Sequence, residues 1–318
     1  MWSRVGLLPV RTTVVVVTWR GRAHIEACLD ALAKQDRPHR ILVVDNASDD
    51  GSGELARDHP TSPEVLRLPR NTGYAGGIQA ALDVCGTPYM AWLNDDAMPL
   101  PGWLSALEDA LDADPRVAAA SAKLLTSTGE VQSVGVGLTR DGHGIDLTEG
   151  PIFGFCGGAA LTRVDALRAI GGVPVEFFCY YEDTDTSWRL RRAGWRIVSV
   201  PAAEVVHLHG ATAHPGSVDF HRWNERNRLL TLLRNAPLRI AVRELARFAV
   251  ITALIPLKRE VPDAANFEVG LRLRVLREVL RRGATKATLV AKSATKATLV
   301  AQVSGSWVGR WSGGRSPT

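Results

Sequence analysis

The first two hundred residues alternate short apolar runs with amphipathic segments, and this alternation constrains the fold more than any other feature of the chain. Thr13–Val17 is a β-branched run typical of a strand buried on both faces. Apolar positions that share one helical face follow at Ile25, Cys28, Leu29 and Leu32. Further strands are predicted at residues 41–44, 65–68 and 89–93. Strands that alternate with helices predict an α/β fold, a mostly parallel sheet flanked by helices.

Polar residues gather where these predicted strands end. The second strand ends at Asp45, and the fourth ends at Asn94, Asp95 and Asp96. Ligands of open α/β sheets bind beyond the carboxyl ends of the strands, and a carboxylate cluster there suits a divalent cation that carries a phosphate group. The alternative is that the two aspartates only cap the helix predicted over residues 103–111. Both interpretations stay open on these residues alone.

A second acidic group follows an aromatic block later in the chain. Residues 177–181 lead directly into Glu182 and Asp183, at the start of a predicted helix. Two short strands are predicted next within residues 196–207, and the second ends at His207. Acids in a first helical turn also interact favourably with the helix dipole, so their position does not by itself indicate a site.

Charge divides the chain into two parts. Residues 1–214 hold 19 Lys/Arg and 26 Asp/Glu, whereas residues 215–318 hold 19 and 7, a net charge of +12. We expect a basic helical region over residues 215–282 and a low-complexity tail over residues 283–318, after an α/β domain that fills the first part. The apolar run Phe248–Leu257 is ten residues long, too short to span a bilayer but able to lie on one.

Several enzyme classes lack their signatures in this sequence. No GxGxxG follows the first strand, and neither GxxxxGK[ST] nor GxSxG occurs. The four cysteines form no CxxC pair, so we expect reduced thiols and no zinc site. The remaining acids and His207 suit a reaction in which a metal neutralises a diphosphate leaving group while a separate carboxylate takes a proton from a hydroxyl. Sugar transfer from a nucleotide sugar has this requirement.

Six short motifs occur in the order in which family 2 glycosyltransferases carry them, and the chain resembles that family over roughly residues 12–235. The motifs are VTWRG at 17–21, VDNASDDGS at 44–52, NTGYAGG at 71–77, LNDD at 93–96, YEDTD at 181–185 with the segment 189–195, and VH at 206–207. The resemblance implies the GT-A fold. Within the family, the chain is most similar to bacterial rhamnosyltransferases and galactofuranosyltransferases that build cell-envelope polysaccharides.

Matched positions imply roles for the polar groups. The donor-binding residues would be Thr18, Asp45, Asn71, Gly73, Asn94 and Asp95. Asp96 and His207 would ligate a divalent metal, Mg²⁺ or Mn²⁺, with His209 as a substitute ligand. The acidic motif opens with Asn94 where the family has an aspartate, which weakens the metal site or leaves more of the coordination to Asp96 and the diphosphate.

The catalytic roles are also implied by the resemblance. Asp183 would be the general base that deprotonates the acceptor hydroxyl, and this gives inversion at the anomeric carbon. Glu182 would raise the pKa of Asp183 by like-charge repulsion. Residues 226–228, Arg-Asn-Arg, are expected either to contact a phosphate or to lie on a solvated helix face. Trp19 is a candidate for stacking beside the donor.

The sequence therefore predicts a metal-dependent inverting glycosyltransferase. It would move a sugar, with rhamnose suggested by the resemblance, from a dTDP- or UDP-sugar to a lipid-linked or polysaccharide acceptor. We expect it in the cytoplasm, in peripheral contact with the anionic inner face of the membrane, and not on nucleic acid, because its basic helices lack an aromatic stacking pattern. The alternatives are a sugar-1-phosphate nucleotidyltransferase and a non-catalytic member that binds nucleotide sugar or polysaccharide.

Overall fold

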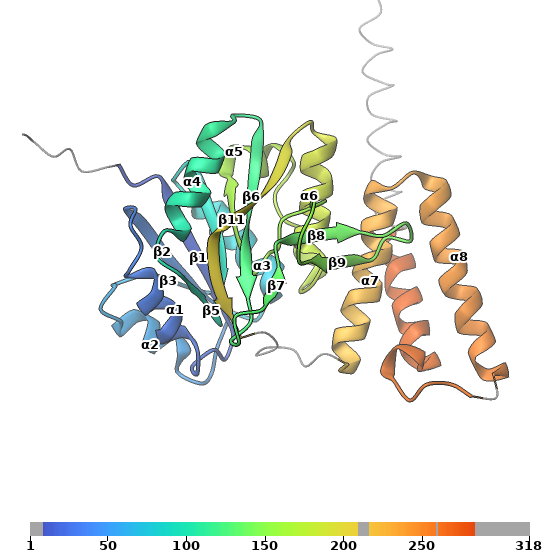
Figure 1. Ribbon diagram of the computed structural model, residues 1–318. Coiled ribbons are helices and arrows are strands. Elements are labelled where there is room, and N and C mark those ends of the chain that lie inside the picture. Colours follow the sequence, from blue (N-terminus) through green and yellow to red (C-terminus); the bar gives the residue numbers. More distant parts are fainter. Residues whose placement is uncertain (1–8, 209–215, 259, 284–318) are drawn as a thin grey trace, which may run out of the picture.

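The computed structural model describes residues 9–208, 216–258 and 260–283. Its larger part is a sheet with helices on both faces (Figure 1). The strands are β1 (Thr12–Thr18), β2 (His39–Asp45), β3 (Glu64–Arg67), β4 (Tyr89–Asn94), β5 (Ala97–Pro99), β6 (Val117–Leu125), β7 (Val131–Ser133), β10 (Ala159–Arg163) and β11 (Arg196–His207). Their order is β3-β2-β1-β4-β10-β6-β11-β5, with β7 paired to β6. A separate hairpin consists of β8 (Gly135–Leu138) and β9 (Gly144–Leu147).

The sheet is mostly parallel, as the sequence predicts. β1 pairs in parallel with β2 and β4, and β2 pairs in parallel with β3. Antiparallel β10 lies between β4 and β6. The order therefore brings the ends of β1, β2 and β4 to one edge of the sheet, where the predicted polar groups follow.

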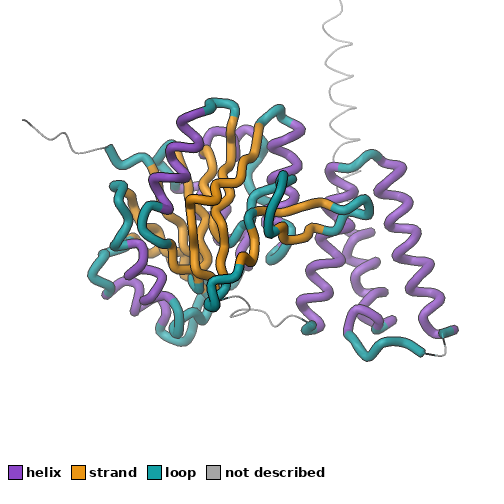
Figure 2. Tube along the Cα trace, in the orientation of Figure 1, coloured by secondary structure: helices purple, strands orange, loops and turns teal. Residues whose placement is uncertain are grey.

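Side chains of β1 alternate between two hydrophobic cores. Val14 and Val16 pack on the face covered by α1 (Ile25–Leu32), α2 (Ser52–Asp58) and α4 (Trp103–Ala113). Val15 and Val17 pack on the other face, against α3 (Gly73–Val84), α5 (Val164–Ala169) and α6 (Glu182–Arg192). The strand is buried on both sides, which explains why it reads as a continuous apolar run. Figure 2 shows the strands between the two helical layers.

Two details differ from the sequence prediction. The two short strands predicted within residues 196–207 are a single strand, β11, whose pairing with β6 shifts register between Val200 and Glu204. Pro201 lies in this irregular stretch and cannot donate a ladder hydrogen bond. The segments β6 to β10 were not predicted, because they are rich in alanine and glycine and carry few of the residues that favour strands.

Helices follow β11. They are α7 (Val218–Asn235), α8 (Leu238–Leu254), the short η2 (Ile255–Leu257) and η3 (Ala265–Phe267), and the helical residues 269–283. This bundle lies beside α6 and the β8–β9 hairpin (Figure 1). Within residues 9–208, 216–258 and 260–283, no helix has the length and apolar character needed to cross a membrane. Beyond Gly283, the predicted low-complexity tail lies outside the described residues.

Candidate active site

Eight residues predicted from the sequence line one cavity of about 360 Å³. They are Asn71, Gly73, Asn94, Asp95, Asp96, Glu182, Asp183 and His207. They come from the end of β4, the start of α3, the start of α6 and the end of β11. Segments more than a hundred residues apart therefore meet at one edge of the sheet, where α/β folds bind ligands.

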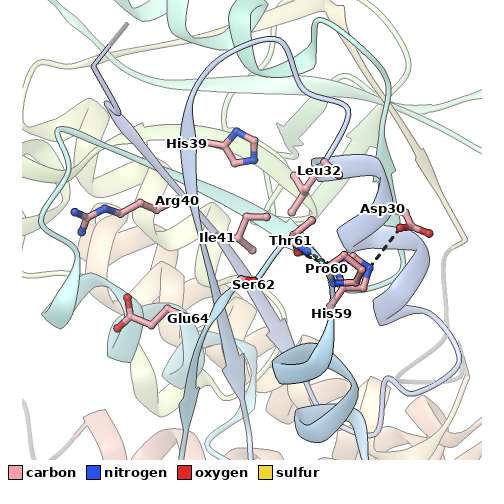
Figure 3. Close-up of a pocket in the computed structure, with 11 residues that line it drawn as sticks. Asp30, Leu32, His39, Arg40, Ile41, His59, Pro60, Thr61, Ser62 and Glu64 are labelled. Carbon is pink, nitrogen blue, oxygen red and sulfur yellow. Dashed lines mark hydrogen bonds and ion pairs between the residues drawn. The ribbon is translucent and has the colours of Figure 1, made fainter. Parts of the chain in front are cut away.

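A second hollow, of about 660 Å³, lies at the other end of β2 (Figure 3). Asp30, His39 and His59 are among its lining residues, and His59 Nε2 lies 3.4 Å from Asp30 Oδ1. None of the predicted site residues lines this hollow. The cavity at the end of β4 is therefore the candidate active site.

Asp96 and His207 face each other in the cavity. Asp96 Oδ1 lies 3.2 Å from His207 Nε2, and neighbouring ligand atoms around an octahedral Mg²⁺ lie roughly 3 Å apart. His207 Nδ1 lies 3.1 Å from Gln132 Oε1. A metal-ligating histidine usually donates its second ring N–H to such an oxygen, which directs the other nitrogen to the ion. The pair therefore fits a divalent cation.

The described part of the chain holds no group of three His, Cys, Asp or Glu side chains arranged for a metal. Asn94, at the first position of the acidic motif, places its amide Nδ2 3.2 Å from His207 Nε2, and an amide nitrogen is not a metal ligand. The remaining coordination positions would therefore fall to donor oxygens and water. The weakening of the metal site by Asn94 stays a prediction.

Burial and hydrogen bonding separate the two aspartates electrostatically. Burial alone would raise the pKa of Asp96, but the hydrogen bond and charge of a protonated His207 outweigh it and hold that pKa below its usual value. With His207 neutral, a bound cation would act on Asp96 in the same direction. Burial raises the pKa of Asp95 to about 7, although the Thr18 hydroxyl donates to Asp95 Oδ2 at 2.6 Å and opposes the shift. Asp96 is the carboxylate that stays ionised and suits a cation.

Two predicted donor-binding residues do not line the cavity. Thr18 is buried and hydrogen-bonded to Asp95, as described above. Asp45 is also buried; it accepts the Ser48 N–H at 2.8 Å and pairs with Arg67 Nη1 at 2.5 Å. Their contact with a donor stays a prediction.

Asn46, next to Asp45, lines the cavity instead. Its Oδ1 accepts the N–H of Thr72 at 2.8 Å, and its Nδ2 donates to the carbonyl oxygen of Gly73 at 3.0 Å. Asn46 therefore holds the start of α3 at the cavity edge. The sequence signal was present, because Asn46 belongs to the motif that follows β2, but the prediction named only Asp45 from this motif, as a donor-binding residue.

Asp183 is the second residue of α6 and lines the cavity. Its Oδ2 accepts the N–H of Gly157 at 2.9 Å, and its Oδ1 accepts the N–H and the hydroxyl of Thr184. Burial is the main cause that raises its pKa, and the charge of Asp146 adds to the effect. A carboxylate with a raised pKa and a fixed orientation suits general-base catalysis.

Glu182 lies next to Asp183 at the start of α6 and also lines the cavity. It is buried, and among the described residues its Oε2 has no hydrogen-bond partner. Its own pKa is raised by burial and then by the charge of Asp183. The sequence prediction that Glu182 also raises the pKa of Asp183 stays a prediction.

The loop before α6 has an unusual backbone. Phe178, Tyr180 and Tyr181 have φ values of 68°, 69° and 69°, in the left-handed region that side chains other than glycine rarely adopt. The N–H of Ala75 donates to the carbonyl oxygen of Phe178 at 3.0 Å, and an added Cβ at Gly73 would collide with that same oxygen. Gly73 therefore allows the loop to lie directly against α3.

Asn227 of α7 fixes this loop from the other side. Its Nδ2 lies within hydrogen-bond distance of three carbonyl oxygens, those of Phe177, Cys179 and Tyr180, at 3.0, 2.8 and 2.8 Å. Arg226 Nη2 donates to the Phe177 oxygen at 2.5 Å.

Residues 226–228 are buried and bind protein groups. The predicted solvated face is therefore wrong, and the phosphate contact stays a prediction. Arg226 and Asn227 position the loop before α6, whereas Arg228 binds the carbonyl oxygen of Asp141 and the carboxylate of Glu225. Local sequence does not show these contacts.

Aromatic rings line one part of the cavity. Phe178 and Trp223 have ring centroids 4.9 Å apart, and Tyr180 and Phe220 have centroids 5.2 Å apart. All four rings line the cavity, as does Trp19, the predicted stacking candidate. The residues from α7 were not predicted to belong to the site; their only signal is the three-residue spacing of two aromatics on one helical face. His209, the substitute metal ligand, lies outside the described residues.

Comparison with known proteins agrees with this geometry. Residues 13–171 match the family model described as "Glycosyl transferase family 2". A curated relative, the N-acetylglucosaminyl-diphospho-decaprenol L-rhamnosyltransferase of Mycobacterium tuberculosis, is 28% identical over 241 residues, which cover 64% of this chain and 78% of the relative.

Two solved structures share the fold. S. aureus TarS has a TM-score of 0.55 at 18% identity, over 79% of this chain and 76% of that structure. A mannosyltransferase from Pyrobaculum calidifontis in complex with GDP-Man and Mn²⁺ has a TM-score of 0.52 at 19% identity, over 91% of this chain and 80% of that structure. These likenesses confirm the predicted GT-A architecture.

Proposed function

This chain belongs to glycosyl transferase family 2 and is a glycosyltransferase, and from that membership we propose that it is a metal-dependent, inverting enzyme. The observation that carries the proposal is the shared cavity of Asp96, His207 and Asp183. Asp96 and His207 fit a cation, and Asp183 fits a general base. These three side chains come from separate segments and line the same cavity. This is the set that displacement of a nucleoside diphosphate by a hydroxyl requires.

Asp96 and His207 would hold the cation, with Gln132 directing the imidazole. When bound, such a cation offsets the negative charge that develops on the leaving diphosphate. Mn²⁺ in the Pyrobaculum calidifontis mannosyltransferase supports this part of the proposal. Either Mg²⁺ or Mn²⁺ suits a carboxylate, an imidazole and diphosphate oxygens.

Asp183 would take the proton of the acceptor hydroxyl. The hydroxyl oxygen then forms its bond to the anomeric carbon as the bond from that carbon to the diphosphate oxygen breaks, so that a single displacement inverts the configuration. The Gly157 N–H and Thr184 hold the carboxylate in place before the reaction, which lowers the cost of orienting the base.

The proposed donor is a dTDP- or UDP-sugar, with rhamnose as the first sugar to test, and the proposed acceptor is lipid-linked or a polysaccharide. The printed name of the Mycobacterium tuberculosis relative, which combines rhamnosyl transfer with a decaprenol-linked substrate, supports both choices. We place the enzyme in peripheral contact with the inner face of the membrane.

Release of nucleoside diphosphate from a panel of dTDP-, UDP- and GDP-sugars tests the function. Purified full-length chain is incubated with Mn²⁺, Mg²⁺ or chelator and a lipid-linked acceptor, and product configuration is read by NMR. We expect metal-dependent release of the diphosphate and an inverted product. Release of pyrophosphate would indicate a nucleotidyltransferase, and donor binding without turnover across the panel would indicate a non-catalytic binding protein; either result overturns the proposal.

A further inference from the structure

The outer face of α8 carries exposed apolar side chains at regular spacing. Leu238, Val242, Val250 and Leu254 on the helix and Leu257 in η2 are between 47% and 78% exposed. Spacings of four and eight residues keep the helical positions on one side, and the inner side packs on α7 through Ala241 and Phe248. α8 lies at the edge of the molecule away from the sheet (Figure 1), where nothing in the described chain covers this stripe.

The exposed charged side chains of α8 itself are basic. Arg239, Arg243 and Arg247 follow at four-residue intervals, and Lys258 follows η2. The single acid between Leu238 and Lys258 is Glu244, which is 2% exposed and is paired with arginines. The exposed charges of α8 itself are therefore basic, although Asp141 of the β8–β9 hairpin pairs with Arg247 and the exposed acids Glu260 and Asp263 follow Lys258. Apolar and basic groups on one helical face are the combination that binds anionic lipid surfaces.

The stripe ends at the same end of the bundle as the aromatic part of the cavity. α7 and α8 are joined by two residues, so the start of α7 lies at the same end of the pair as the end of α8 (Figure 1). The first turns of α7 supply Phe220 and Trp223 to the cavity, and the end of α8 with η2 supplies exposed Leu254 and Leu257.

We propose that the exposed face of α8, continued by η2, docks on the surface of an anionic lipid bilayer. Charge complementarity favours this occupant, because the exposed charges on the helix itself are basic. A second copy of the chain would have to place the same arginines against each other. The use of such docking rests on the proposed function, since a lipid-linked acceptor reaches the aromatic part of the cavity from a membrane surface.

Vesicle flotation with the full chain tests the docking. Vesicles of phosphatidylcholine alone are compared with vesicles that contain added phosphatidylglycerol, without donor, metal or acceptor, at low and high salt. We expect binding to the anionic vesicles that weakens with salt. The double variant Val242→Glu/Val250→Glu should lose this binding at least tenfold, and Arg239→Glu should weaken it less.

Val84→Glu is the matched control. Val84 ends α3, is 57% exposed and lies far from α8 in the chain, so its variant should bind vesicles as the wild type does. Thermal unfolding of all variants checks folding. Light scattering checks for a dimer that the double variant abolishes.

Three results would overturn the docking proposal: no binding to anionic vesicles at low salt, equal binding by the double variant, or an α8-dependent dimer that binds no vesicle. Because flotation uses no substrate, failure of docking leaves the transfer reaction untouched. Failure of donor turnover likewise leaves the docking result standing.

Discussion

The two sides of the cavity are built by different means. On one, which we call the strand side, Asn94, Asp95, Asp96 and His207 follow directly from regular strands whose backbone bonds are satisfied in the sheet. On the other, the loop side, Asp183 and the aromatic residues follow a backbone with positive φ values. Strand geometry fixes the first side, whereas the second needs side chains from α7 to hold it. The difference predicts that the two sides respond differently to substitution.

The largest effect is expected on the loop side, from Asp183→Asn. Loss of the base should lower turnover by about 10²–10⁴-fold, while metal-dependent donor binding on the strand side persists. Initial rates and calorimetric donor titration measure the two quantities. Asp165→Asn, which changes an exposed acid in the first turn of α5, should leave turnover unchanged. Wild-type turnover in Asp183→Asn would remove this residue from the mechanism.

Asp96→Ala tests the strand side, where metal-dependent donor binding should be lost. Without the oxygen that lies 3.2 Å from His207 Nε2, donor affinity in Mn²⁺ should fall roughly 10²-fold. It should then equal the affinity of the wild type in chelator, measured by calorimetry. Asp183→Asn serves as the control, because it should keep the Mn²⁺ effect. If Asp96→Ala also keeps it, Asp96 is not a metal ligand.

Much of the strand side could be predicted from the sequence, because strands bring their ends to one edge and polar residues after them are visible in the motifs. What the sequence did not show are the partners of those residues. The ion pair of Asp45 with Arg67 and the hydrogen bond of Thr18 to Asp95 join positions 22 and 77 residues apart. These contacts decide whether a side chain reaches the cavity, and they depend on packing.

The loop side could be predicted only in part. Asp183 was found from its motif, but the aromatic lining and the role of Asn227 were not, because α7 meets the loop through tertiary contacts about 50 residues apart in sequence. Hydrogen bonds from a side-chain amide to three carbonyls have no sequence pattern. The same limit applies to β6 through β10, whose alanines and glycines become strands only between their neighbours.

Asn227→Ala should therefore disturb the loop side alone. It removes the side-chain donor to the part-buried carbonyl oxygens of Cys179 and Tyr180, while Arg226 still donates to that of Phe177. The loss should cost about 1–3 kcal/mol of stability and lower turnover by roughly tenfold through the displaced base. Metal-dependent donor binding should be retained. Chemical denaturation, initial rates and calorimetry measure these effects. The control is Asn224→Ala on the same helix, whose amide bonds only to Phe220 of its own turn; equal effects of the two variants would contradict a specific role for Asn227.

The smallest effect on turnover is expected from Glu182→Gln, and its main effect should be on stability. The pKa of Glu182 is raised by burial and then by Asp183, so the folded chain keeps a proton that the unfolded chain releases above about pH 4.3. The free energy of unfolding contributed by this carboxyl therefore falls as pH rises toward the raised pKa.

Glutamine carries no such proton, so the melting temperature of Glu182→Gln relative to the wild type should rise by a few degrees between pH 5 and pH 8. Glu54→Gln is the control, since Glu54 is an exposed acid in the first turn of α2 and should show no such trend. A pH-independent difference for Glu182→Gln would mean that the carboxyl is solvated in the folded chain. The loop side would then be open to water at Glu182, which would contradict the burial of this side chain.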